Sequence, residues 1–218
     1  MLRYGSLPLN LNDRGTLMAE DKKRILGIVL KAAQQYHDEL ENKNLLFVYK
    51  TKQNTIETLE VAFLSQHFLH LTGLNIDKRL MSANKFYERC LTKRLKLNDF
   101  ECNKDGSTEL KLAVINLLLT KNLGAANMIG TFDNSAFYLQ TDRFVGSQKG
   151  CIGFIKHKGN GQYIPNTLLK VDGRKQIKQT GRVLLTYRKN MTEDSYTECV
   201  YKRFCKDGQF QSENFDYQ

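Results

Sequence analysis

Early in the chain, apolar residues recur at the three- and four-residue spacing of a single helix face. Lysine, glutamine and glutamate occupy the opposite side, and Glu20 and Asp21 lie near the start, where acidic groups suit the positive end of a helix dipole. The apolar stripe comprises Ile25, Ile28, Val29, Ala32, Ala33, Tyr36 and Leu40. This pattern predicts an amphipathic helix over residues 18–40.

Two extended runs come next and predict a β-hairpin. Residues 45–50 form the first expected strand, residues 56–64 form the second, and Lys52-Gln53-Asn54 is the turn between them. Directly after the second strand the apolar period changes from that of a strand to that of a helix, and Gly73 marks the end of this helical turn.

The junction between strand and helical turn carries two of the four histidines, His67 and His70. Junctions of this kind present polar side chains on a rigid scaffold. We therefore expect the segment Leu59–Asn75 to form the centre of a functional site.

The remainder of the chain predicts two further helices and then a series of short strands. The helices are expected at residues 83–97 and 108–122, with Gly124 as a C-terminal cap of the second. The Asn160-Gly161 pair is typical of a hairpin turn. The strands are expected at residues 128–132, 136–140, 150–156, 162–170, 183–188 and 196–204. The fold class is α+β, with a helical N-terminal part packed on a curved, mostly antiparallel C-terminal sheet.

Length and composition favour one intracellular domain. The chain has 218 residues, 41% of them hydrophobic, which is enough for a sizeable core. We expect an irregular lead-in over residues 1–17 and one domain over 18–218, helical to about 124 and β-rich from 125 to 205. No apolar run approaches the roughly 20 residues that cross a bilayer, and the start resembles no secretory signal. Five cysteines without paired short spacing indicate free thiols, no zinc site and a cytoplasmic location.

Positive charge is concentrated in one segment. The net charge is +10. Between Arg143 and Lys189 there are eleven lysines and arginines and one acid, Asp172, so this segment alone carries +10. Such a segment favours binding to a partner that carries phosphate groups, and we expect this partner to be RNA. The alternative is that these charges serve solubility.

The absence of several known motifs limits the kinds of catalytic site that the sequence can form. The sequence contains no glycine-rich phosphate loop, nucleophile elbow or zinc-protease helix, and its acids do not cluster as a magnesium site requires. We therefore expect neither metal nor cofactor. Metal-free RNA cleavage needs a base for the 2′-hydroxyl proton, an acid for the departing 5′-oxygen, and cations around the phosphorane. Histidine suits the first two roles because it titrates near neutrality.

His70 is the first candidate for the acid or base, with Thr72 as a hydroxyl that orients the histidine or the phosphate. The alternative is a core histidine bonded to backbone. His67 is close to the same face, His157 lies beside a hairpin tip, and His37 is expected on the surface of the first helix.

Candidate cations and aromatic residues come from the basic segment. Arg174 is a candidate because its planar guanidinium can grip phosphate with two donors. Tyr163 and Tyr187 could stack on unpaired bases, although aromatic residues in strands are usually core. The other candidates for nucleic-acid binding are Lys149, Lys156, Lys158, Lys175 and Arg188, each of which could instead be a solubility charge.

The string Phe68-Leu69-His70-Leu71-Thr72-Gly73-Leu74, placed directly after a hairpin, resembles the signature of a phage-associated nuclease family. That family belongs to the barnase–EndoU–colicin–RelE-like superfamily of metal-independent ribonucleases. The block Tyr163–Leu169, followed by Asp172 and Arg174, is similar to a later block of the family. The resemblance covers residues 21–204.

The resemblance implies a helical lead followed by a curved antiparallel sheet with RNA bound across it. It also implies a phage or mobile-element origin and a role as a toxin or effector in the host cytoplasm. His70, Thr72 and Arg174 match motif positions, whereas the remaining candidates rest on charge and placement alone.

Two functions from different classes remain open. The first is an endoribonuclease with RNA as substrate and with an antitoxin or another protein partner. The second is a non-catalytic phage protein that binds nucleic acid or inhibits a host defence complex. A DNA-binding regulator is less favoured because no helix-turn-helix motif is present. No membrane partner is expected.

Overall fold

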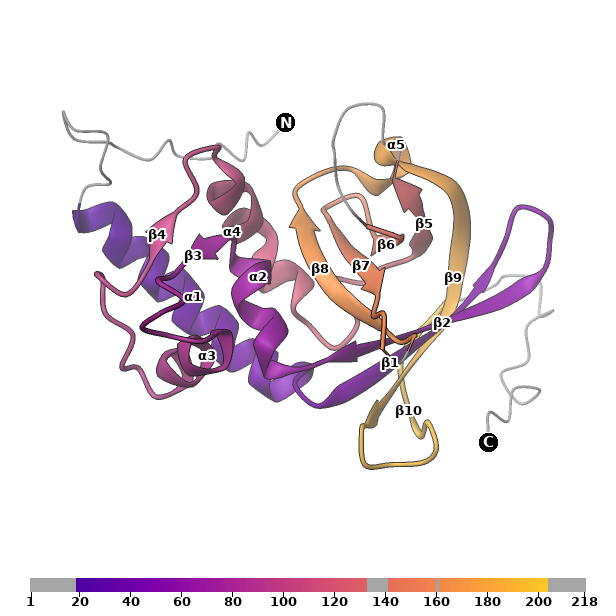
Figure 1. Ribbon diagram of the computed structural model, residues 1–218. Coiled ribbons are helices and arrows are strands. Elements are labelled where there is room, and N and C mark those ends of the chain that lie inside the picture. Colours follow the sequence, from indigo (N-terminus) through magenta and orange to yellow (C-terminus); the bar gives the residue numbers. More distant parts are fainter. Residues whose placement is uncertain (1–18, 133–140, 160, 204–218) are drawn as a thin grey trace.

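The computed structural model describes residues 19–132, 141–159 and 161–203, which form a helical part beside a strongly curved sheet (Figure 1). The helices are α1 (Ala19–Glu39), α2 (Phe68–Thr72), α3 (Ala83–Leu91), α4 (Ser107–Leu118) and α5 (Gly173–Gln176), and the 3-10 turn η1 (Ser65–His67) precedes α2. The strands are β1 (Lys43–Lys50), β2 (Ile56–Phe63), β3 (Leu74–Asn75), β4 (Glu101–Cys102), β5 (Met128–Phe132), β6 (Arg143–Gly146), β7 (Cys151–Lys156), β8 (Tyr163–Leu169), β9 (Ile177–Asn190) and β10 (Glu198–Lys202). The predicted α+β class is confirmed.

The main sheet has eight strands in the order β1-β2-β8-β7-β6-β5-β9-β10, and β1 also pairs with β9. The sheet therefore closes on itself. Its pairs are antiparallel except that β2 and β8 run parallel, where Val61 lies opposite Tyr163. The hairpin β1–β2 thus belongs to the sheet, although it lies within the part expected to be helical. Strands β3 and β4 form a separate two-stranded sheet.

Several predicted boundaries differ from the structure. The helix expected to reach residue 97 ends at Leu91, because the chain turns with Lys93 at a φ of 56°. The helix expected to reach residue 122 ends at Leu118 and is capped by Leu119, not by Gly124. Strand β6 was not expected, and β9 begins six residues before the predicted strand at 183. The lead-in, the strand at 136–140 and Asn160 lie outside the described residues.

An aromatic cluster joins the helices to the sheet. Tyr36 of α1 contacts Phe63, Phe68 and Tyr87, with ring centroids 5.4–6.1 Å apart, and Phe63 also packs edge-on against Phe154 of β7. The Tyr36 hydroxyl donates to the Leu64 carbonyl at 2.9 Å. Burying each such ring contributes about 2 kcal/mol. The segment from η1 to α2 is thereby fixed between the two parts of the fold.

Candidate active site

Helix α2 holds one histidine outward on a rigid base. Phe68 and Leu71 are fully buried, and this orientation leaves His70 on the exposed side. The helix ends at Gly73, whose φ of 68° favours glycine. A Cβ at Gly73 would lie 2.9 Å from the Lys111 side chain and 3.2 Å from the Thr108 backbone, so only glycine allows α2 to approach α4 this closely.

Thr72 closes the end of the same helix. Its side chain is fully buried, and its hydroxyl donates to the Leu69 carbonyl at 2.6 Å and accepts from the Leu74 amide at 3.1 Å. Both hydrogen bonds are local, so the hydroxyl caps the helix instead of facing solvent. The structure does not bring Thr72 into contact with the His70 partner groups described next.

Asn166 of β8 orients the His70 imidazole. Its side chain hydrogen-bonds with the ring of His70, and its amide nitrogen donates to the Thr141 hydroxyl at 3.2 Å. In the register of β7 and β8, Gly153 faces Thr167 and Phe154 faces Pro165, so Asn166 is the extra residue of a β-bulge. Bulges re-aim side chains and occur often beside active sites.

Lys111 of α4 places a positive charge beside His70. Its ammonium group donates to the His70 carbonyl at 2.8 Å. Packing around the imidazole and the charge of Lys111 lower the pKa of His70, while the bond to Asn166 partly offsets them. Burial also lowers the pKa of Lys111 itself. His70 is therefore neutral at pH 7 and able to accept a proton.

His67 lies beneath this surface and differs from His70 in burial. Its exposed fraction is 7%, and its Nδ1 accepts a hydrogen bond from the Leu64 amide at 3.2 Å. Burial, with smaller effects of His157 and His70, lowers its pKa to about 4. The neutral ring therefore carries its proton on Nε2, which is buried without a partner among the described residues.

His157 and His70 both lie close enough to His67 to lower its pKa, so three of the four histidines share one region. His157 is exposed in the turn between β7 and β8, where its Nδ1 accepts from the Gly159 amide at 3.2 Å. Lys156 and Lys158 flank it in the sequence and are also exposed. Tyr163 begins β8 and packs, half-buried, against the main core. The fourth histidine, His37, is exposed and contacts Glu41 at 2.6 Å.

A second group of predicted residues lies elsewhere. The Gly173 amide donates to the Ser147 carbonyl at 3.0 Å and thereby docks α5, with Arg174 and Lys175, on the turn that carries Lys149. Figure 1 shows α5 well separated from α2. The structure therefore does not bring Arg174 to His70. The guanidinium of Arg174 instead pairs with the carboxylate of Asp172 at 2.6 Å.

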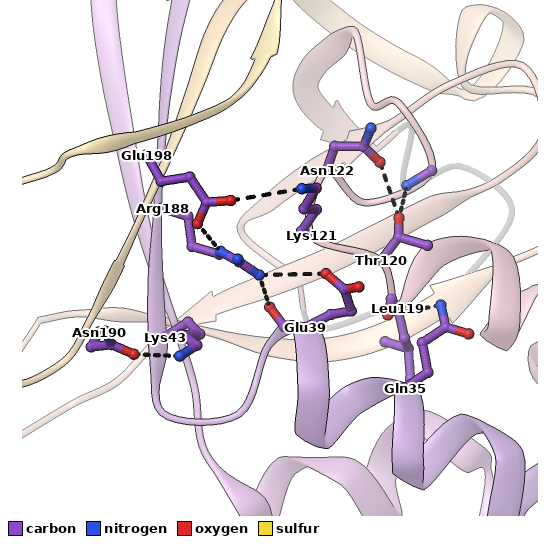
Figure 2. Close-up of polar contacts among 11 residues, drawn as sticks. Gln35, Glu39, Lys43, Leu119, Thr120, Lys121, Asn122, Arg188, Asn190 and Glu198 are labelled. Carbon is purple, nitrogen blue, oxygen red and sulfur yellow. Dashed lines mark hydrogen bonds and ion pairs between the residues drawn. The ribbon is translucent and has the colours of Figure 1, made fainter.

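Arg188, another predicted phosphate contact, is held by internal partners (Figure 2). Its Nε donates to Glu198 at 2.7 Å, and its Nη1 donates to the Glu39 carbonyl at 2.9 Å. Lys121 contacts the other oxygen of Glu198 at 3.7 Å. Neighbouring Tyr187 is half-buried against the cluster of Val48, Leu184 and Leu185. Arg188 thus links β9, β10 and α1.

Sequence reasoning singled out His70 and missed Asn166 and Lys111. Asn166 lies inside the block Tyr163–Leu169 that carried the family resemblance, and this was the signal available. Within residues 19–132, 141–159 and 161–203, no cluster of three or more histidine, cysteine or acidic side chains suits a metal ion. No helix in the same ranges is long and apolar enough to span a bilayer.

The comparison with known proteins gives one family match for this chain. A family profile described as phage-Barnase-EndoU-ColicinE5/D-RelE like nuclease4 matches residues 28–204, which is most of the chain. No curated protein and no solved structure gives a match. The chain therefore belongs to this family and is a nuclease of the barnase–EndoU–colicin–RelE type.

Proposed function

We propose that the protein is a metal-independent endoribonuclease of phage or mobile-element origin that acts as a toxin or effector in the host cytoplasm. The observation that carries the proposal is the His70 imidazole, which is exposed, neutral at pH 7 and oriented by Asn166. A base held by a second side chain has the arrangement expected of proton transfer in catalysis.

In this proposal His70 takes the proton of a ribose 2′-hydroxyl, and the resulting oxygen attacks the adjacent phosphorus. The bond to the 5′-oxygen breaks, and His157 supplies the proton to that leaving oxygen. The products are a 2′,3′-cyclic phosphate and a free 5′-hydroxyl. Lys111 and the exposed Lys156 and Lys158 supply positive charge as the phosphorane forms.

His67 has a different role in the proposal. Its pKa of about 4 leaves it uncharged at pH 7, and its burial keeps it from substrate. Through its bond to the Leu64 amide it fixes the turn that leads into α2. We therefore assign His67 to positioning of the histidine group and not to proton transfer.

The test is cleavage of a labelled mixed RNA in EDTA by the unmodified protein and by His70→Ala, with analysis of the product ends. We expect cyclic phosphate ends from the unmodified protein and a loss of about 10²–10⁴-fold in the variant. Equal thermal unfolding of the two proteins controls for folding. Salt-dependent RNA binding by both without cleavage would instead support the non-catalytic binding protein.

A further inference from the structure

A strongly basic pocket lies apart from the histidines. It has a volume of about 660 Å³ and is bordered by the end of β1, an interior part of β9, the start of β5, the turn after β6, α5 and the residue after β10. Its charged lining is entirely cationic: Lys50, Lys52, Arg174, Arg182 and Arg203. The polar lining adds amide and hydroxyl groups from Thr51, Asn54, Asn127 and Gln148. Within the described part of the chain, no carboxylate lines the pocket.

Among the described residues, carboxylates neutralise only part of the positive charge in this pocket. Arg174 pairs with Asp172. Over the described residues, the side chains of Lys50, Lys52, Arg182 and Arg203 form no ion pair. Charge held together without counter-charges raises the local potential and attracts anions. Arg188 differs, because Glu39 and Glu198 neutralise it.

Strand pairing fixes the two central cations side by side. Lys50 at the end of β1 is the register partner of Arg182 on β9, and Arg182 in turn faces Met128 of β5. The next residue of β9, Val183, is buried in the main core, so Arg182 points to the outer face of the sheet. The rigid ladder keeps both charges together, although like charges repel.

We propose that this pocket binds the phosphate groups of a single-stranded RNA at a distance from the cleaved bond. This inference rests on the proposed ribonuclease function and extends it to the substrate. Phosphate oxygens are the usual partners of clustered lysine and arginine, and such contacts position a strand without reading its sequence. A pocket with four cations that have no ion-pair partner among the described residues matches more than one phosphate, which favours a strand over a single free phosphate.

The geometry sets the length of strand that reaches both sites. Between Arg182 on β9 and Asn166 on β8 the sheet offers two routes, three inter-strand steps over β1 and β2 or four over β5, β6 and β7, which correspond to about 14 and about 19 Å. At about 3.4 Å per stacked nucleotide these distances correspond to about four to six nucleotides. The exposed Lys149 and Lys175 lie on the turn and helix beside this path. A trinucleotide at His70 would not reach the pocket.

The test compares RNA binding by two double variants that each remove one lysine and one arginine. Lys50→Gln with Arg182→Gln alters the pocket, whereas Lys96→Gln with Arg94→Gln removes exposed charges at the end of α3. The probes are 2′-O-methyl single strands of 12 and 3 nucleotides, which the proposed 2′-hydroxyl mechanism cannot cleave. We expect the pocket variant to bind the 12-mer about tenfold more weakly and to lower its salt slope by about 1.4.

The control variant and the trinucleotide make the result decisive. We expect the control variant to bind the 12-mer as the unmodified protein does, and the pocket variant to keep its affinity for the trinucleotide. Equal loss in the two variants, or equal loss for both oligonucleotides, would overturn the inference. Lys50→Arg with Arg182→Lys should restore the 12-mer affinity. Because no probe is cleaved, failure of the ribonuclease proposal would appear separately, in the EDTA assay.

Discussion

The histidine group and the Arg188 network both bring polar side chains together from distant parts of the chain. They differ in how far oppositely charged side chains neutralise their charges. Arg188 has two carboxylate partners, and every donor-acceptor pair drawn in Figure 2 links protein groups to each other. Among the described residues, the charges that act on His70 are those of Lys111 and Lys78, and the side chain that bonds to the ring is the neutral Asn166. A satisfied network stabilises the fold, whereas an unbalanced one is available to a ligand.

This difference teaches how to interpret basic residues in a sequence. Arg188 and Arg182 lie six positions apart on the same strand, and both fall in the basic segment. Arg188 is neutralised by Glu39 of α1, whereas Arg182 lies in a pocket whose described lining contains no acid. Substitutions of single residues in the two regions test this difference.

Replacing Asn166 should have the largest effect. Asn166→Ala removes the group that orients His70, and we expect kcat/KM for RNA cleavage to fall about 100-fold, or about 2.7 kcal/mol. The bond to Asn166 raises the pKa of His70, so its loss should move the acid limb of the pH profile to lower pH. Asn166→Asp should move that limb upward, because a carboxylate favours the protonated ring. An unmoved profile in both variants would restrict Asn166 to a packing role.

Replacing Arg188 should affect stability and not chemistry. Arg188→Gln breaks charge-assisted bonds to Glu198 and Glu39, and we expect a loss of about 2 kcal/mol in the free energy of unfolding. Urea denaturation measures this loss. Cleavage per folded molecule should stay within about twofold. A large fall in cleavage with unchanged stability would place Arg188 in the substrate path instead.

Lowering the pH should show the contribution of His67 to the free energy of unfolding. Its pKa is about 4 in the folded protein and near 6.5 when unfolded, so between these values the unfolded chain binds the additional proton. Stability therefore rises with pH, and moving from pH 7 to pH 5 should cost about 2 kcal/mol through this residue. In His67→Phe that part of the pH dependence should vanish. The variant would argue against this assignment if its stability fell between pH 7 and pH 5 as much as that of the unmodified protein.

Replacing Thr72 should have the smallest effect. Thr72→Val keeps the shape but leaves the Leu74 amide without its acceptor, and we expect a loss of about 1 kcal/mol in stability. Cleavage should remain near that of the unmodified protein. Thr72→Ser, which keeps the hydroxyl, is the matched control and should retain most of the stability. If cleavage fell in Thr72→Val and did not change in Thr72→Ser, the Thr72 hydroxyl would have a role in cleavage.

Local patterns in the sequence were sufficient for most of the elements. The apolar stripe of α1 and the hairpin β1–β2 depend on neighbouring residues only, and both are confirmed. The start of β9 was missed because its lysine- and glutamine-rich sequence, with Gly181, is not typical of a strand. Gly181 is required there by tertiary contact, since a Cβ would lie 2.5 Å from the Tyr49 ring.

The site was only partly predictable for the same reason. His70 follows from the period change after β2, but its partners Asn166 and Lys111 come from β8 and α4, and no local pattern joins them. The neutralisation of Arg188 by Glu39 spans 149 positions, so sequence alone could not distinguish it from the cations of the pocket. Thr72 matched the motif, and its hydroxyl bonds within the turn.

The pairing of β1 with β9 has a consequence during protein synthesis. Lys43 and Asn190 meet although 147 positions separate them, and β8 must be in place before Asn166 can reach His70. A nascent chain therefore exposes His70 well before the ribosome has translated the residues that orient it. Because such long-range closure is slow to form, we expect the growing polypeptide to remain latent. A ribonuclease built in this way would spare the messenger from which it is being translated.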